Sequence, residues 1–297
     1  MDLQGKLIAV VGANASGKSA LGVRLAQAFG GEIVSADSRQ VYRGLDLGSG
    51  KITPEETRGV PHHLLDVVEP NDFFSMADFQ RQAYRAIDDI LARGKIPFLV
   101  GGTGLYVASV TEGYLLSDRE PNLAYREELE KLTTPELYEM LLRAIPNVEI
   151  DRNNRNRVMR ALEKIESGDT QPPSRKKRYE TLKIGVSWDR DTLCARIDER
   201  LERRMRAGMA DEVRQLLKNG ASVEFLMKLG LEYRFLTRYV LGEYASETEM
   251  TDELARAIKQ FAKRQRTWFR RDAEIRWLDM TGDPFAEASG WIREFLK

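Results

Sequence analysis

Short apolar runs alternate with amphipathic stretches along the first third of the chain. LIAVV at residues 7–11 is followed by Gly12, GEIVSAD ends in Asp37, and IPFLVGGTG leads into a glycine turn. Runs of branched aliphatic residues are typical of parallel strands that are buried on both faces. Between these runs, apolar residues recur at helical spacing from Ser19 to Phe29 and from Ser75 to about Gly94. The alternation predicts an α/β fold with a doubly wound parallel sheet.

The pattern changes after about Leu115, where aliphatic strands give way to charged helical stretches such as YREELEKL and RVMRALEKIE. We therefore expect a helical insertion at 115–182, between a first part of the core at 1–114 and its completion at 183–297. TLKIGVSW returns to strand character, and long helices are predicted from about Asp191 to Lys218 and from about Thr251 to Arg271. The basic, proline-containing stretch GDTQPPSRKKRYE predicts a surface loop.

Composition narrows the class of protein. The 297 residues carry a formal net charge of +0, so a polyanionic partner must be met by local clusters of basic residues. A lone Cys194 excludes an internal disulfide framework and a cysteine-based zinc site, which fits a reducing cytoplasm. The apolar run near the amino terminus is too short for a signal peptide or a membrane span. We therefore expect a cytoplasmic protein without a membrane partner.

A phosphate-binding motif follows the first predicted strand. The sequence fits GxxxxGK[ST] between strand and helix, and it comprises Gly12, Ala13, Asn14, Ala15, Ser16, Gly17, Lys18 and Ser19. In such a loop backbone amides converge on phosphate oxygens, Lys18 adds a charge, and Ser19 would place a hydroxyl on Mg2+. The alternative is a glycine-rich turn with an incidental lysine. IPFLVGGTG lacks the carboxylate of an ordinary P-loop hydrolase, which argues against routine nucleotide hydrolysis.

Further segments resemble one known family in order and spacing. With the phosphate loop, they are SADSRQVYRGLDLGSGK, GVPHHLLDVVEP, GGTGLYV, RVMRALE, RIDERLERRMRAGMADEV and AKRQRTWFRR. Together they resemble the tRNA dimethylallyltransferases, from about Leu7 to Asp279. The resemblance implies a P-loop that binds dimethylallyl diphosphate with Mg2+, and an acceptor amine at N6 of adenosine 37 in tRNAs reading codons that begin with U. Gly104 departs from the family by replacing a bulkier apolar residue, and we expect it to widen or loosen the acceptor pocket.

Three catalytic roles follow from the resemblance. Asp37 matches the general base, Thr103 a threonine that positions the acceptor, and Arg200 an arginine that contacts the leaving diphosphate. The chemistry is consistent, because an exocyclic adenine amine is a weak nucleophile and a carboxylate that accepts its proton is typically worth about 10²- to 10⁴-fold in rate. Positive groups also stabilise the departing diphosphate. The alternatives are a turn-capping Asp37, an Arg200 on a salt-bridged helix face, and a Thr103 that serves only the turn.

Basic residues cluster in residues 152–178 and in residues 256–276, against a neutral background. The resemblance implies tRNA contacts at Asp37, Ser38, Arg39, Gln40, Thr103, Arg126, Asn156, Arg157, Arg160, Lys263, Arg264 and Gln265. The target adenine of the anticodon stem-loop would then be extruded into the site. Solvated helix faces remain an alternative for the basic clusters, and core packing is favoured for Trp268 and Phe269.

Other functions stay open at this stage. An adenylate isopentenyltransferase would use the same donor with a free nucleotide, although a small acceptor needs neither the insertion nor AKRQRTWFRR. A P-loop small-molecule kinase would turn over ATP, and an RNA-binding P-loop regulator would need no catalytic Asp37. We expect a monomer with dimethylallyl diphosphate and tRNA as its ligands.

Overall fold

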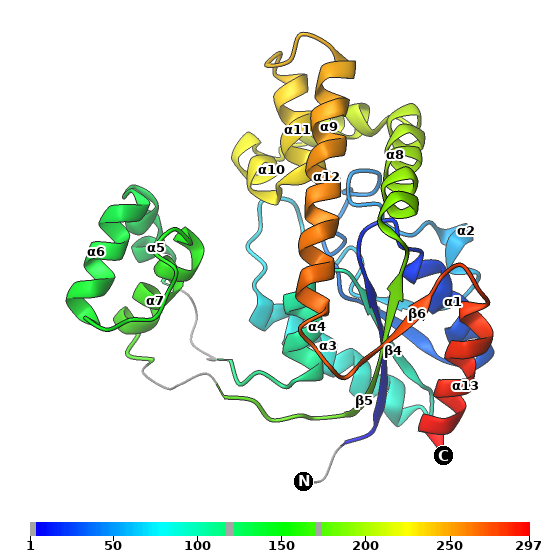
Figure 1. Ribbon diagram of the computed structural model, residues 1–297. Helices are drawn as coiled ribbons and strands as arrows, with labels where there is room; N and C mark the ends of the chain where they lie inside the picture. Colours follow the sequence, from blue (N-terminus) through cyan, green and yellow to red (C-terminus); the bar gives the residue numbers. More distant parts are fainter. Residues whose placement is uncertain (1–3, 117–121, 170–173) are drawn as a thin grey trace. The chain divides into compact units, whose positions relative to one another are not determined.

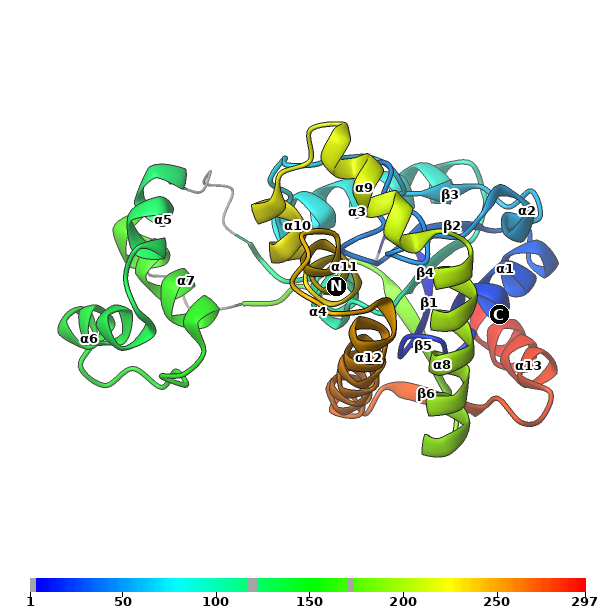
Figure 2. The ribbon, with the colours of Figure 1, turned by 90° about the horizontal axis from the view of Figure 1, so that it is seen from above.

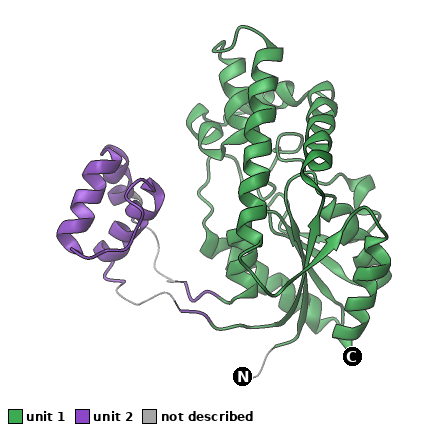
Figure 3. Ribbon diagram, viewed as in Figure 1, with its two compact units in different colours: residues 1–113, 176–297 green, residues 114–175 purple. Residues whose placement is uncertain are grey.

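The computed structural model describes residues 4–116, 122–169 and 174–297. The chain divides into two compact units, of which one comprises Met1–Gly113 with Lys176–Lys297 and the other Tyr114–Arg175 (Figure 3). The smaller unit ends before the boundary that we predicted at residue 182, because the chain after Arg175 already belongs to the larger unit. There the Lys176 amide donates to the Gly113 carbonyl at 2.7 Å. Residues 170–173 of the predicted surface loop lie outside the described residues.

The larger unit is built on a sheet of six parallel strands in the order β3-β2-β4-β1-β5-β6. The strands are β1 (Lys6–Gly12), β2 (Glu32–Ser35), β3 (His62–His63), β4 (Pro97–Gly101), β5 (Glu180–Ser187) and β6 (Ile275–Asp279). Every side chain from Leu7 to Val11 is fully buried, as expected for a central strand. The predicted parallel sheet is confirmed, whereas β3 and β6 were not predicted.

Helices cover both faces of this sheet (Figures 1 and 2). Leu7 and Ala9 pack with residues of α3 and α4, while Ile8 and Val10 face α1 and α13. The sheet is therefore doubly wound. The helices of the larger unit are α1 (Lys18–Ala28), α2 (Pro54–Thr57), α3 (Met76–Ala92), α4 (Gly104–Thr111), α8 (Arg190–Arg206), α9 (Met209–Lys218), α10 (Val223–Leu229), α11 (Leu231–Val240), α12 (Glu247–Phe269) and α13 (Pro284–Leu296).

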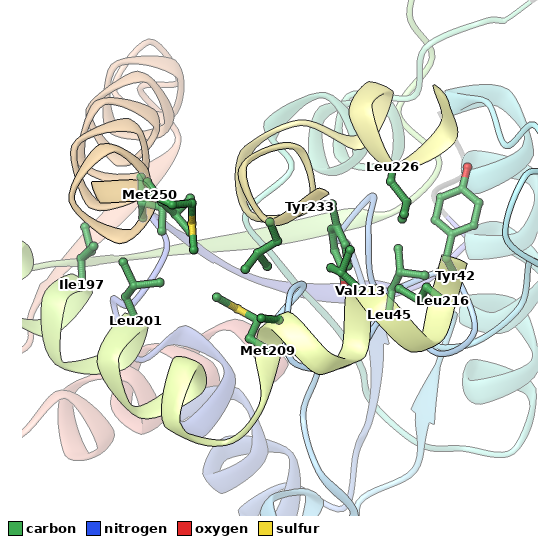
Figure 4. Packing of buried hydrophobic residues seen from close by; sticks show 14 of the residues in the cluster. Tyr42, Leu45, Ile197, Leu201, Met209, Val213, Leu216, Leu226, Tyr233 and Met250 are labelled. Carbon is green, nitrogen blue, oxygen red and sulfur yellow. The ribbon is translucent and has the colours of Figure 1, made fainter. Parts of the chain in front are cut away.

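The helices α8 to α12 form a second layer, which extends from the end of the sheet where β5 leads into α8 (Figure 1). Their buried side chains, among them Leu201, Met209 and Tyr233, make one apolar cluster (Figure 4). The single helix predicted from Asp191 to Lys218 is wrong, because Gly208 adopts a φ of 95° and separates α8 from α9. That backbone conformation is open mainly to glycine.

The smaller unit consists of α5 (Leu123–Glu130), α6 (Thr134–Ala144) and α7 (Arg155–Glu166). Its core includes Leu137, Leu141 and Val158, so the predicted helical character is confirmed. Arg155, counted above in a basic cluster, donates instead to three carbonyls at the end of α5 and just beyond it. None of the described helices has the length and apolar character that crossing a membrane requires.

Candidate active site

The phosphate loop connects β1 to α1, in the position that its motif predicts. Gly17 precedes α1 with a φ of 90°, and no side chain caps the helix. The amides of the first helical turn therefore have no side-chain acceptor, and the positive end of the helix dipole faces the loop. Lys18 is buried, with its Nζ 3.3 Å from the Ala13 carbonyl oxygen. This arrangement suits a phosphate ligand.

Lys18 and Asp37 lie on the same cavity, which is also lined by Ser19, Arg200 and Arg204. Burial lowers the pKa of Lys18 to about 8, the negative charge of Asp37 opposes this change, and the charge of Arg200 adds to it. An anionic ligand in the cavity would favour the protonated lysine. The predicted cation and carboxylate are therefore brought together at one site.

Two side chains, one just before α8 and one on it, hold the phosphate loop from outside. The indole Nε1 of Trp188 donates to the Ser16 carbonyl at 3.0 Å, and Nε of Arg196 donates to the Ala15 carbonyl at 3.0 Å. The Arg196 guanidinium also lies 4.8 Å from the centre of the Trp188 ring, within the range of a cation–π contact. The motif alone gives no sign of this bracing.

Gln265 lies inside the protein, although the resemblance groups it with tRNA contacts. Its side chain is buried on α12, with Oε1 accepting from the Asn14 amide at 2.9 Å and Nε2 donating to the Gly102 carbonyl at 2.8 Å. Asn14 belongs to the phosphate loop, and Gly102 precedes Thr103. One side chain thus connects the loop of the expected donor site with the turn of the expected acceptor site.

Asp37 and Thr103 belong to neighbouring turns, since β2 and β4 pair directly. Asp37 Oδ1 accepts from the Arg39 amide at 3.0 Å, so Asp37 does cap its turn, as the alternative above proposed. Asp37 also lines the cavity. The Thr103 hydroxyl accepts from the Ser38 amide at 3.1 Å, and the Thr103 amide donates to the Ala36 carbonyl at 3.2 Å. These bonds fix the spacing of the two turns.

Arg200 reaches the cavity from α8. Its Nη2 donates to the Gly50 carbonyl at 3.1 Å, and the same carbonyl accepts from Nε2 of Gln40 at 3.2 Å. Burial and then the nearby charge of Arg204 lower the pKa of Arg200 from its ordinary value. Arg200 therefore faces a desolvated, positively charged wall, and the salt-bridged outer face considered above does not describe it.

The structure also brings in charged residues that we did not single out from the sequence. Glu232 of α11 is buried on the cavity wall and pairs with Nη1 of Arg39 at 2.9 Å. Glu212 of α9 accepts from the backbone amides of residues 46–48 at 2.5 to 3.0 Å. Both glutamates lie on amphipathic helices, where charge alone does not distinguish an inward-facing acid from a solvated one.

Five other predicted RNA contacts are exposed on helices, whereas Ser38, Arg39 and Gln40 are only partly exposed in the turn after β2. Lys263 and Arg264 are exposed on α12 of the larger unit. In the smaller unit, Asn156, Arg157 and Arg160 are exposed on α7, while Arg126 of α5 and Arg160 pair with the buried Glu163 at 3.2 and 3.1 Å. Each unit thus carries some of the residues that are expected to contact tRNA.

Two aromatic residues of α12 occupy apolar surroundings. Phe269 is buried in the core, as favoured above. Trp268 packs against Gly104 so closely that a Cβ there would lie 2.2 Å from the indole Cδ1. The space beside Gly104 is therefore filled by an aromatic ring.

Comparisons with known proteins support the family suggested by the sequence. The profile of the IPP transferase family matches residues 40–272, and that of isopentenyl transferases matches residues 5–69. The chain is 46% identical to tRNA dimethylallyltransferase 2 of Shewanella sediminis over 290 residues, which cover 95% of this chain and 96% of the relative. It is 42% identical to the tRNA dimethylallyltransferase of an Exiguobacterium species, with 97% of each chain covered.

Solved structures agree with this relationship. The tRNA isopentenylpyrophosphate transferase of Bacillus halodurans is 39% identical, with a TM-score of 0.74 and coverage of 98% of this chain and 95% of that one. A eukaryotic dimethylallyltransferase acting on tRNA is 25% identical, with a TM-score of 0.75 and coverage of 93% and 74%. Because the family profile spans well over half of the chain, this protein belongs to the IPP transferase family, in which its curated relatives are tRNA dimethylallyltransferases.

Proposed function

We propose that this protein transfers a dimethylallyl group from dimethylallyl diphosphate to N6 of adenosine 37 in tRNAs reading codons that begin with U, releasing diphosphate. One observation carries the proposal beyond family membership. Lys18 of the phosphate loop, the Asp37 carboxylate and Arg200 line a single cavity. A diphosphate held by Lys18 and the loop amides would therefore lie in the same cavity as a base for the incoming amine.

The residues divide the chemistry between two reacting groups. As the bond from nitrogen to the allylic carbon forms and the bond from carbon to oxygen breaks, Asp37 accepts the amine proton. Negative charge grows on the departing diphosphate, and Lys18 and Arg200 stabilise it. Thr103, whose turn is joined to that of Asp37 through Ser38, positions the acceptor.

Magnesium fits the donor atoms of this cavity. Mg2+ is usually bound by one or two protein oxygens together with substrate phosphates and water, and it neutralises phosphate charge. Ser19 and Asp37 bring a hydroxyl and a carboxylate to the cavity, and no group of three potential metal ligands from His, Cys, Asp and Glu occurs in the described residues. Ser19 would hold the ion, with the remaining ligands supplied by the diphosphate and water.

We assign tRNA as the acceptor because the curated relatives of this protein are tRNA dimethylallyltransferases and because both units carry exposed basic residues. Lys263 and Arg264 on α12, and Asn156, Arg157 and Arg160 on α7, are exposed and available for the anticodon stem-loop. We infer a monomer that acts in the cytoplasm.

A transfer assay tests the proposal directly. With Mg2+ and labelled dimethylallyl diphosphate, label should pass to unmodified tRNA and not to AMP, which the adenylate isopentenyltransferase alternative requires. Asp37→Asn should lower the rate about 10²- to 10⁴-fold while leaving tRNA affinity unchanged. Asp72→Asn, which alters an exposed loop carboxylate that does not line this cavity, is the matched control. An Asp37→Asn enzyme of normal rate would refute the assignment of the base.

A further inference from the structure

A second cavity-lining arginine lies one helical turn beyond Arg200. Arg196, Arg200 and Arg204 are spaced four residues apart on α8 and therefore share one face. Arg196 donates to the phosphate loop, Arg200 to the Gly50 carbonyl, and Arg204 to the Gly48 carbonyl. Arg200 and Arg204 both line the cavity that contains Lys18.

The Arg204 side chain is held by two partners, but one of its nitrogens has no hydrogen bond. It is only 13% exposed, and its Nη1 lies 3.5 Å from Oε1 of Glu232, whose side chain is 4% exposed. Its Nε is buried without a hydrogen-bond partner. Buried polar atoms are normally bonded. The unpaired Nε of Arg204, a residue of the cavity wall, therefore indicates a ligand that supplies an acceptor.

The charges of the cavity wall point to the kind of ligand. Lys18, Arg200 and Arg204 are opposed by Asp37 and Glu232, so the wall carries one more positive charge than negative. Arg200 and Arg204 also repel one another, and an anion between them would relieve that repulsion. A diphosphate monoester has three ionisable oxygens, so its complex with Mg2+ keeps one negative charge when they are fully ionised. The net charge of the cavity wall and the net charge of this complex are therefore equal and opposite.

We propose that Arg204 is a further diphosphate-binding residue, held on the cavity wall by the Gly48 carbonyl and the buried Glu232 carboxylate. Its guanidinium offers planar donors that suit phosphate oxygens. Glu232 is a positioning residue in this scheme: it contacts Arg204, and its own charge is balanced by its ion pair with Arg39. The inference deepens the proposed function by adding a donor-site contact.

Calorimetric titration of the full-length protein with inorganic diphosphate and Mg2+ tests the assignment. A hydrogen bond to a charged group is worth about 1.5–3 kcal/mol, so Arg204→Met should weaken diphosphate binding roughly 10- to 150-fold. Arg204→Lys should be intermediate, because it keeps the charge and loses the planar donors. Arg203→Met, which removes an exposed arginine next in sequence, should bind as the unmodified protein does.

A double variant separates direct contact from simple neutralisation. If Arg204 only masks Glu232, then Arg204→Met with Glu232→Gln should regain normal diphosphate affinity, and the inference fails. It also fails if Arg204→Met binds diphosphate normally, or if that variant loses tRNA affinity in the absence of donor while keeping diphosphate affinity. Diphosphate binding that depends on Arg204, without prenyl transfer to tRNA, would refute the proposed function and leave this site standing.

Discussion

The Gln265 bridge between donor and acceptor loops offers the sharpest test of the architecture. Gln265→Met keeps nearly the same side-chain volume and removes both the acceptor for the Asn14 amide and the donor for the Gly102 carbonyl. Each lost hydrogen bond is worth about 1 kcal/mol, and a buried polar group left unpaired costs about 1–3 kcal/mol. The free energy of unfolding should therefore fall by about 2–4 kcal/mol.

Catalysis should also suffer, because the same bonds set the distance between the phosphate loop and the turn that carries Thr103. A misplacement of about 1 Å between reacting groups can cost about 10²-fold in rate. We expect kcat/KM for prenyl transfer to fall roughly 10- to 100-fold, with tRNA affinity unchanged.

Chemical denaturation, steady-state kinetics and tRNA binding measure the three effects separately. The matched control is Gln260→Met, which makes the same chemical change at an exposed position of α12. The reasoning is refuted if Gln265→Met keeps its stability and donor kinetics but loses tRNA affinity. In that case Gln265 would be the direct tRNA contact that the resemblance implies.

Three further substitutions have defined outcomes. Glu32→Gln should lower the free energy of unfolding at pH 7 by about 1–3 kcal/mol, because a neutral amide replaces the charged acceptor of the exposed Arg93 and Lys95 side chains. The Arg93 hydrogen bond holds the pKa of Glu32 well below its ordinary 4.5. The loss of stability in the Glu32→Gln variant should therefore be complete above pH 4.5 and should shrink as the pH falls below it, because Glu32 of the unmodified protein then becomes protonated as well, first in its unfolded and then in its folded state. Denaturation of both proteins at several pH values measures this difference. Gly50→Ala should weaken diphosphate binding at least several-fold in a titration, since the φ of 63° disfavours alanine and the new Cβ would lie 2.1 Å from Nη2 of Arg200. Glu212→Gln should reduce stability by about 1–3 kcal/mol in denaturation experiments, because a neutral amide replaces the charged acceptor of three amides in the loop before Gly50.

Local signals in the sequence were sufficient for the centre of the fold. LIAVV could be assigned to a buried strand because it has no polar face, and the glycine motif after it fixed the start of α1. The periodicity of Leu193, Ile197 and Leu201 correctly predicted α8. The residues after Gly208 also have a helical pattern, so the local pattern offered no reason to end the helix there. The break depends on a backbone angle at one glycine, and periodicity carries no information about it.

The strands β3 and β6 were missed for a different reason. β3 has only two residues, and β6 places Arg276 among apolar neighbours, so neither gives a sustained pattern. Each lies at an edge of the sheet, where pairing with one neighbour is enough to define a strand. Such strands depend on the sheet being present already, and local sequence shows them weakly.

The candidate site shows the same division between local and tertiary information. Lys18 and Asp37 could be named from the sequence because each follows a strand that ends at the same edge of the sheet. The inward direction of Gln265 could not, since its partner Asn14 lies 251 residues away. Its neighbours Lys263 and Arg264 are exposed, so a run of polar residues on one helix serves two different surfaces.

The geometry of the site is therefore set by the late helices as much as by the sheet. The sheet brings the phosphate loop and the Asp37 turn to one edge, but their distances are fixed by side chains of α8 and α12. Arg196 and Gln265 bind the phosphate loop from these two helices, and Arg200 binds the Gly50 loop. Since α8 and α12 pack in one apolar cluster, a change in that cluster would move all three contacts together. Core substitutions between α8 and α12 at positions away from the donor cavity, such as Leu193→Ala, should for this reason alter donor binding as well as stability.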